Sequence, residues 1–200
     1  MKINKLLPDI YEIEDFVSED EQFYVINQIE SLDQKYWEPL NKEHYEFDFW
    51  YGKVLDPMGQ GLDNFVYDGI YKRCRGIFDS VLDLTGINVA RYTKYDALGE
   101  HRDYWKYDED YHIRYGLVIY WNDDYEGGEI QYRELGLTHK PKARSLLIHG
   151  GNILHGTLPV KSDNFRYVST LFVKGSKDKP AVLSKELFDG IEESDGTIYR

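Results

Sequence analysis

A chain of 200 residues has the length of one domain with short extensions. Its hydrophobic content of 42%, with 16% aromatic residues in the chain, supports a packed core and excludes a wholly disordered protein. Asp and Glu number 36 against 24 Lys and Arg, and the resulting net charge of −12 disfavours nucleic acids and anionic membranes as partners.

The cysteine content and the hydropathy of the chain exclude further classes of protein. Cys74 is the only cysteine, so the chain can form neither an internal disulfide nor an all-cysteine metal site. The sequence contains no secretory signal and no apolar run long enough to cross a membrane. We therefore expect a cytoplasmic protein with no membrane partner.

The N-terminal part has the pattern of a strand followed by two helices. We predict a short strand over residues 10–16. Ser18 and Glu21 form a capping box ahead of apolar residues at helical spacing, which predicts a helix over 19–31. A second helix is predicted over 63–84, because six apolar residues fall on one helical stripe: Val66, Ile70, Cys74, Ile77, Val81 and Leu84. On that stripe, Cys74 is expected to be a small buried hydrophobe rather than a reactive thiol.

From Ile87 onward the pattern is that of antiparallel β structure. Turn residues separate β-branched and aromatic runs with no helix between them: INVARYTKY, YHIRYGLVIYWN, GGEIQY, KARSLLIHG, NILHGTLPV and NFRYVSTLFVKG. This predicts a mainly β sandwich or barrel core over 87–175 with N-terminal helices in 1–86. Residues 35–61 are expected to be irregular or short-stranded, and 176–200 to be a docked helix or a mobile tail.

His101 and Asp103 are the first candidates for chemistry. Side chains two apart on a strand point to the same face, so the imidazole and the carboxylate would converge on one ion. A further histidine on a neighbouring strand would complete a 2-His-1-carboxylate facial triad, and His155 lies near the start of a predicted strand. Taken alone, a His-X-Asp triplet is more often a surface pair at a strand end.

Arg166 supports a functional role for His101 and Asp103. On the predicted strand it shares a face with Val168 and Thr170, and a buried arginine requires an anion. A metal triad beside such an arginine suits a dicarboxylate cosubstrate, which chelates the metal at one end and pairs with the guanidinium at the other.

At these residues the sequence resembles the iron(II)- and 2-oxoglutarate-dependent oxygenases of the prolyl 4-hydroxylase-like branch. The matching text is ARYTKYDALGEHRDY, RYGLVIYWNDDYEGGEIQY, KPKARSLLIHGGNILHGTLPV and FRYVSTLFVKG. The resemblance implies one oxygenase domain over 1–200 with a double-stranded β-helix (jelly-roll) core. It implies iron(II), 2-oxoglutarate and O2 as cofactor and cosubstrates, with ascorbate as a further candidate.

The resemblance also assigns roles by position. His101, Asp103 and His155 would be the iron ligands, and Arg166 would bind the distal carboxylate of 2-oxoglutarate. Three more residues are candidates for that pocket, with ordinary core packing as the alternative for the tyrosines: Tyr120, Tyr92 and Thr170.

Several residues depart from the family pattern. His149 is a rival ligand shortly before His155. Asn164 stands where a turn glycine is common and suits a left-handed turn, and Arg144 replaces a frequent glycine. Surface or loop roles are expected for the remaining histidines, which lack an evident carboxylate partner: His44, His112 and His139.

The substrate implied is a prolyl residue of a peptide or protein. Trp105 and Trp50 lie in aromatic, acidic segments that could clamp such a peptide. Three alternatives stay open: an oxygenase acting on another side chain, a free amino acid or a small metabolite; a non-catalytic jelly-roll binding module; and a zinc hydrolase.

Overall fold

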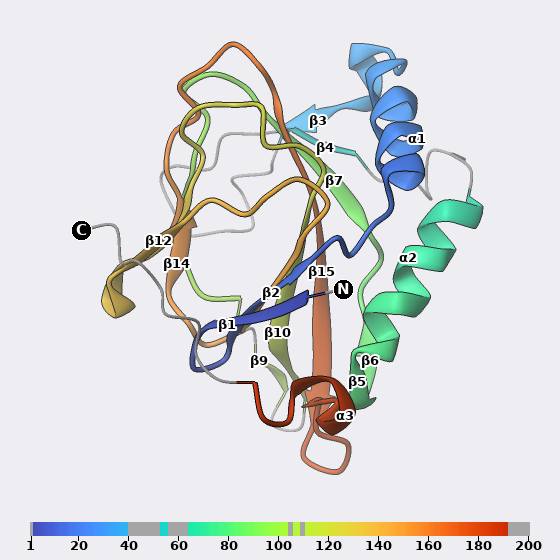
Figure 1. The fold of residues 1–200 in the computed structure, drawn as a ribbon, viewed down its shortest axis with the longest axis vertical. Coiled ribbons are helices and arrows are strands. Elements are labelled where there is room, and N and C mark those ends of the chain that lie inside the picture. Colours follow the sequence, from blue (N-terminus) through green and yellow to red (C-terminus); the bar gives the residue numbers. More distant parts are fainter. Residues whose placement is uncertain (1, 40–52, 56–63, 104–105, 109–110, 192–200) are drawn as a thin grey trace.

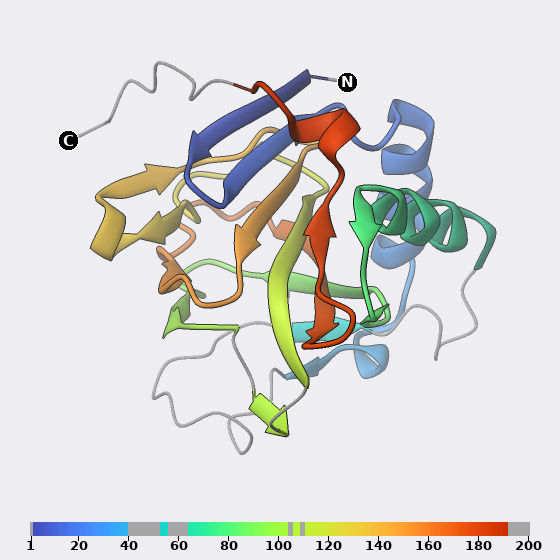
Figure 2. The same ribbon diagram turned by 90° about the horizontal axis from the view of Figure 1, so that it is seen from below.

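The computed structural model describes residues 2–39, 53–55, 64–103, 106–108 and 111–191. Two antiparallel sheets enclose one hydrophobic cluster, and the helices α1 (Glu19–Glu30) and α2 (Asn64–Gly76) lie together on the outer side of the larger sheet (Figures 1 and 2). This arrangement confirms the mainly β fold with a jelly-roll core. The division into 1–86, 87–175 and 176–200 stays a prediction.

The larger sheet has ten strands in the order β1-β2-β13-β10-β15-β7-β4-β3, with β6 on β15 and β9 on β10. Their bounds are β1 (Lys2–Leu7), β2 (Ile10–Glu14), β3 (Glu38–Pro39), β4 (Lys53–Leu55), β6 (Asp83–Leu84), β7 (Asn88–Tyr92), β9 (Lys106–Asp108), β10 (Tyr111–Tyr120), β13 (Leu146–Gly150) and β15 (Arg166–Ser176). The smaller sheet has the order β12-β11-β14-β8. Its strands are β8 (Leu98–His101), β11 (Ile130–Tyr132), β12 (Leu137–His139) and β14 (His155–Thr157).

Strand alternation separates two hydrophobic clusters. On β10, Leu117 and Ile119 face α1 and α2, whereas Tyr120 faces the smaller sheet. On β15, Leu171 joins the helix-side cluster and Val168 the cluster between the sheets. Because side chains alternate along a strand, one strand can brace the helices and line the interior at the same time.

The first predicted helix is confirmed as α1 (Glu19–Glu30). The Ser18 hydroxyl accepts a hydrogen bond from the Glu21 backbone N–H, 3.2 Å away. In return, the Glu21 carboxylate accepts one from the Ser18 backbone N–H at 2.8 Å. This capping box satisfies donors that the first helical turn would otherwise leave unpaired.

The second predicted helix is shorter than its apolar stripe. The helix α2 (Asn64–Gly76) ends at Gly76, and β5 (Phe78–Ser80) and β6 replace the expected last turns. The prediction over 63–84 is therefore wrong beyond Gly76. Leu84 is still buried, because β6 pairs with β15 and sheet pairing overrides the helical period. Cys74 is fully buried, and burial raises the pKa of its thiol to about 12.

The flanking segments are described in part. Residues 35–61 contribute a 3-10 turn (Gln34–Tyr36) with β3 and β4, and the rest of that stretch lies outside the described residues. At the other end, β16 (Val182–Leu183) pairs with β5, and α3 (Lys185–Phe188) follows. The Phe188 ring meets that of Tyr11 edge to face with centroids 5.1 Å apart, so this part of the tail is docked.

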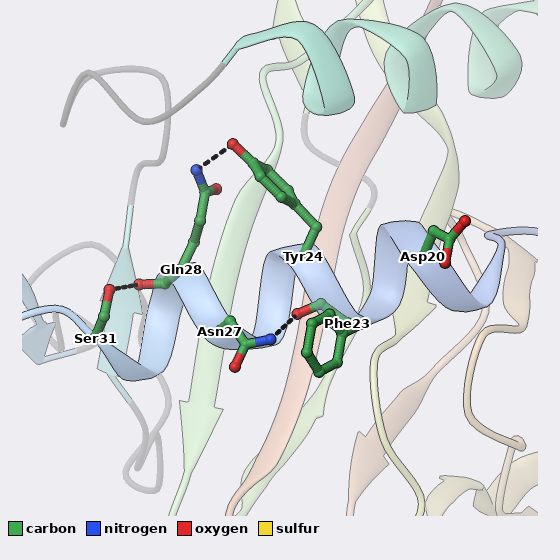
Figure 3. Close-up of a pocket in the computed structure, with 6 residues that line it drawn as sticks. All are labelled: Asp20, Phe23, Tyr24, Asn27, Gln28 and Ser31. Atoms are coloured by element: carbon green, nitrogen blue, oxygen red, sulfur yellow. Dashed lines mark hydrogen bonds between the residues drawn. The ribbon is translucent and has the colours of Figure 1, made fainter.

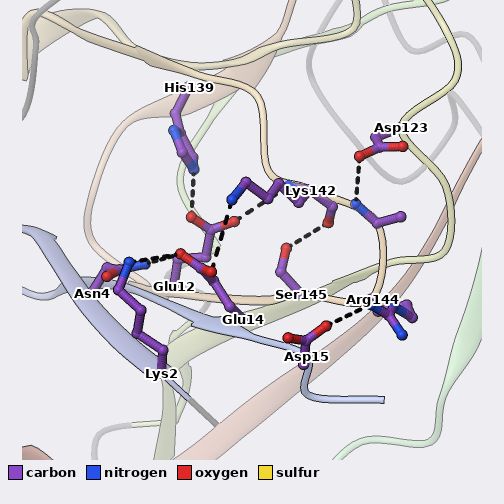
Figure 4. Close-up of polar contacts among 11 residues, drawn as sticks. Lys2, Asn4, Glu12, Glu14, Asp15, Asp123, His139, Lys142, Arg144 and Ser145 are labelled. Carbon is purple, nitrogen blue, oxygen red and sulfur yellow. Dashed lines mark hydrogen bonds and ion pairs between the residues drawn. The ribbon is translucent and has the colours of Figure 1, made fainter. Parts of the chain in front are cut away.

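Arg144 occupies the left-handed region at φ 69°, where a glycine would be unstrained. Its carbonyl oxygen accepts hydrogen bonds from the backbone N–H groups of Phe16 and Val17, at 2.9 and 3.2 Å. Its guanidinium pairs with Asp15 at 2.7 Å (Figure 4). The expectation for Asn164 is wrong, since it lacks a positive φ and its side-chain amide instead donates to the Asp124 carbonyl at 2.7 Å.

None of the helices in the described part of the chain has the length and apolar character that a membrane crossing requires.

Candidate metal centre

His101 and His155 are cross-strand partners at the edge of the smaller sheet. They are register partners in the pairing of β14 with β8, and their ring centroids lie 4.4 Å apart. Asp103 follows β8 and places its Oδ1 3.3 Å from His101 Nε2 and its Oδ2 3.8 Å from His155 Nε2. The three candidate ligand atoms lie within 4.8 Å of one another. The three side chains therefore converge as the sequence predicts, although Asp103 lies beyond the end of β8 and not on the strand.

The Nε2 atoms of both imidazoles face the carboxylate. His101 Nδ1 lies 2.8 Å from the Gly99 carbonyl oxygen, and His155 Nδ1 lies 3.0 Å from that of Ile153. A ring that donates its Nδ1–H to a carbonyl keeps a lone pair on Nε2. Two imidazole lone pairs and a carboxylate directed at one point are all acceptors, which is the arrangement that a cation joins.

Asp103 and His155 have the protonation states of metal ligands. His101 and His155 are buried, and the side chain of Asp103 is only 6% exposed. Burial acts to raise the pKa of the Asp103 carboxyl, but the interactions with His155, His101 and His149 hold it well below the usual range. Burial and neighbouring His149 lower the pKa of His155 to about 3, against the pull of Asp103. An ionised Asp103 carboxylate and a neutral His155 imidazole bind metal without first releasing protons.

His149, the rival ligand, lies against Asp103 but outside the group of three. It projects from β13 with Nε2 2.9 Å from Asp103 Oδ2 and Nδ1 3.0 Å from the Tyr132 hydroxyl. Its ring centroid is 4.1 Å from that of His155.

Gly116 makes room for the centre. It is the β10 partner of His149 in the pairing with β13. A Cβ at this position would lie 2.4 Å from Asp103 Oδ2 and 2.4 Å from His149 Nε2. Sequence parity places Gly116 on the same face as Tyr120 but gives no sign of this contact, which depends on the loop that carries Asp103.

Arg166 is buried in a cage of aromatic side chains. Its guanidinium carbon lies 4.7 Å from the ring centroid of Tyr92 and 5.2 Å from that of Tyr120. One Nη2–H donates to the Tyr120 hydroxyl at 3.4 Å, whereas Nε and Nη1 are buried with no hydrogen-bond partner. Among the described residues no carboxylate pairs with this guanidinium. Two donor nitrogens without a partner on a buried cation are costly, so the cage fits a carboxylate ligand.

Tyr125 belongs to this cage although no sequence pattern indicates it. Its hydroxyl is buried without a partner, and burial raises its pKa while Arg166 acts in the opposite direction. Gly128, at φ 68°, allows the approach, because a Cβ there would meet Arg166 Cδ at 2.9 Å and the Tyr125 ring at 3.0 Å. Thr170 lies opposite Val118 on the inward side of β15 and is partly exposed.

The other sequence candidates have different places. Trp50, Trp105 and His44 lie outside the described residues. His112 lies in β10. His139 was expected to lack a carboxylate partner, and this is wrong, because its Nε2 lies 3.1 Å from Oε2 of the buried Glu12 (Figure 4).

A surface pocket on the outer face of α1 carries none of these candidates (Figure 3). Its polar groups largely bond one another: Gln28 donates to the Tyr24 hydroxyl at 2.7 Å, and Asn27 to the Phe23 carbonyl at 2.8 Å. Phe23 is 73% exposed. The candidate ligands and Arg166 therefore lie in the interior between the sheets and not at this pocket on α1.

Comparison with known proteins assigns this interior to a family. A family model described as the 2OG-Fe(II) oxygenase superfamily matches residues 87–174, which contain the candidate ligands and Arg166. A search of curated proteins found no match. The family match confirms the resemblance of residues 87–174 to the iron(II)- and 2-oxoglutarate-dependent oxygenases.

Solved structures share the fold at low sequence identity. A viral collagen prolyl hydroxylase from Paramecium Bursaria Chlorella virus-1, in complex with 2-oxoglutarate, is 21% identical with a TM-score of 0.62, over 83% of this chain and 96% of that one. A Trichoplax adhaerens prolyl hydroxylase, bound to a hypoxia inducible factor peptide fragment, is 17% identical with a TM-score of 0.62, over 82% and 83%. HygX from Streptomyces hygroscopicus, with nickel, 2-oxoglutarate and hygromycin B, is 14% identical with a TM-score of 0.55, over 84% and 83%.

Gly116→Ala should abolish tight iron(II) binding, because the new methyl group would displace the Asp103 carboxylate. We expect iron affinity to fall about 100-fold or more, since substitutions of residues that only hydrogen-bond to metal ligands already cost about 10–100-fold in affinity. Anaerobic equilibrium dialysis against iron(II) measures it.

Gly69→Ala is the matched control, because it adds the same methyl group within α2 where no atom lies within 4 Å. It should leave iron affinity unchanged and stabilise the protein by about 1 kcal/mol through helix propensity. Equal iron binding by both variants would contradict the placement of Gly116 against the candidate ligands.

Proposed function

From the premise that residues 87–174 form a 2OG-Fe(II) oxygenase domain, we propose that this protein is a hydroxylase acting on prolyl residues of a peptide or protein. The observation that carries the proposal is the buried, unpaired Arg166 on the same inner surface as the three metal ligands. A metal group alone also suits a hydrolase, but a second, dicarboxylate ligand gives Arg166 a function.

Strand β10 relates the two halves of the proposed site. Gly116 faces the candidate iron ligands and Tyr120 contacts Arg166, and the even spacing puts both on one face of the strand. One small dicarboxylate extending along this face would have a metal at one end and a guanidinium at the other. This supports chelation of iron by the keto-acid end of 2-oxoglutarate.

In this proposal, His101, Asp103 and His155 hold iron(II). When bound, iron(II) and 2-oxoglutarate supply the activation of O2, in which 2-oxoglutarate is decarboxylated to succinate and CO2 and a C–H bond of the substrate is hydroxylated. Ascorbate is proposed only as an auxiliary reductant. Three protein ligands leave coordination positions for the two cosubstrates.

Arg166 would bind and orient 2-oxoglutarate. Its Nε and Nη1 groups are free to donate to the distal carboxylate, and the hydroxyl of Tyr120 is within reach of the same guanidinium. Burial of the cage strengthens this charge pair by excluding water. Tyr92 and Thr170 would complete the walls of the pocket.

Support for a prolyl substrate comes from the structural relatives. Two of them are prolyl hydroxylases, and one of these is bound to a peptide fragment. The net charge of −12 would favour a peptide with basic or neutral flanks. Trp50 and Trp105 are the proposed contacts for that peptide. HygX, with hygromycin B bound, supports a small molecule as the second candidate.

Arg166→Met should weaken 2-oxoglutarate binding while leaving iron(II) binding intact, because it removes the charge but preserves much of the side-chain volume. Loss of one partner of a buried charge pair costs about 2 kcal/mol or more, which is about 30-fold in affinity. Anaerobic titration of the iron-loaded protein with 2-oxoglutarate, followed by the visible charge-transfer band, measures the change.

Arg91→Met is the control for Arg166→Met. Arg91 is the register partner of Tyr167, and it stacks on the ring of Trp37 at 4.3 Å outside the cage. Its replacement should leave the 2-oxoglutarate titration unchanged. If both variants titrate like the unmodified protein, Arg166 is not the carboxylate site.

The substrate proposal predicts hydroxylation of proline in peptides. Incubation with iron(II), 2-oxoglutarate and O2 should add one oxygen atom to proline-containing peptides, as read by mass spectrometry, and should produce one succinate per hydroxylation. Zinc in place of iron should give neither product. Succinate formation without peptide hydroxylation would support an oxygenase but contradict a prolyl substrate. Peptide cleavage with zinc would favour a hydrolase.

A further inference from the structure

His149 stands where an apolar strand would place an apolar residue. Its neighbours along β13 are Leu146, Leu147 and Ile148, all fully buried, and His149 itself is 1% exposed. A polar ring in such a place destabilises the fold unless it is hydrogen-bonded. Both ring nitrogens of His149 are bonded, one to Asp103 and the other to Tyr132.

The partners of His149 fix which nitrogen carries the proton. The Asp103 carboxylate is an acceptor only, so the contact at 2.9 Å requires a proton on Nε2. In a neutral imidazole Nδ1 is then an acceptor, and the Tyr132 hydroxyl, 3.0 Å away, is its donor. The chain of donors therefore runs from Tyr132 through His149 to Asp103.

We propose that Tyr132 and His149 are positioning residues that hold the Asp103 carboxylate in its iron-binding orientation. The inference rests on the proposed function. The bond from His149 occupies Oδ2 and leaves Oδ1, which is 3.3 Å from His101 Nε2, for the metal. A carboxylate held at one oxygen cannot rotate freely, so the ligand set is organised before the metal binds.

Local packing supports this role. Gly116, opposite His149 in the β10–β13 pairing, provides the space in which the ring and the carboxylate meet. The Tyr132 ring is fully buried and lies 6.0 Å from the ring of His155, so the donor chain is anchored to the same cluster. The competing role for His149, that of a fourth metal ligand, requires the opposite tautomer, with the Nε2 lone pair free.

The test compares anaerobic iron(II) affinity across four variants, with the thermal melting of each apoprotein as a second readout. His149→Phe removes the donor and should weaken iron binding about 10–100-fold. His149→Gln retains an N–H near the position of Nε2 and should stay within about threefold of the unmodified protein. Tyr132→Phe leaves the tautomer unfixed and should show a loss between these two.

His139→Gln is the matched control. His139 also pairs with a buried carboxylate, that of Glu12, but at a site made by β12 and β2 (Figure 4). It should change iron affinity less than twofold, whatever its effect on melting. A general effect of breaking a histidine–carboxylate pair would appear in this variant as well.

Each outcome supports or overturns the positioning role of His149 and Tyr132. No iron binding by the unmodified protein contradicts the proposed function itself, whereas normal binding by His149→Phe overturns only the positioning role. Equal losses in His149→Phe and His149→Gln, with normal melting of both, overturn it in favour of a fourth ligand. If His149→Phe does not fold, Tyr132→Phe decides: a loss of threefold or more supports the role, and an unchanged affinity overturns it.

Discussion

The Asp103 carboxylate is shielded from water, so its charge must be stabilised by neighbouring side chains. The same side chains form the candidate metal centre in the interior of the protein. The interactions with His155, His101 and His149 keep the carboxyl ionised against the effect of burial. The Nε2 atoms of His101 and His155 face it with lone pairs, because their Nδ1 atoms are bonded to backbone carbonyls. The site therefore directs several acceptor atoms at one point. A bound cation would stabilise this arrangement.

The two-layer architecture lets this centre coexist with a stable fold. The helix-side cluster binds α1 and α2 to the outer face of the ten-stranded sheet, and the smaller cluster lines the space between the sheets (Figures 1 and 2). β10 and β15 serve both clusters through alternate side chains. Arg166 begins β15, so the proposed carboxylate site is fixed to one of the central strands rather than to a mobile loop.

Much of this could be predicted from sequence, because it depends on local patterns. The strand periods predicted β7, β10, β13 and β15, and the His-X-Asp spacing with His155 predicted the group of three side chains that the structure brings together. Contacts set by pairing partners could not be predicted. The helix over 63–84 ends at Gly76 because β6 adds to the sheet, and neither the His149–Asp103 bond nor the demand for glycine at position 116 follows from its own segment.

The most direct test is a crystal structure of the protein grown without oxygen in manganese(II), as a stand-in for iron(II), and 2-oxoglutarate. The account predicts one anomalous peak bonded to His101, Asp103 and His155, with the distal carboxylate of 2-oxoglutarate paired to Arg166. A metal bound elsewhere, or a 2-oxoglutarate whose distal carboxylate lies away from Arg166, would contradict the assignment of this interior as an oxygenase site.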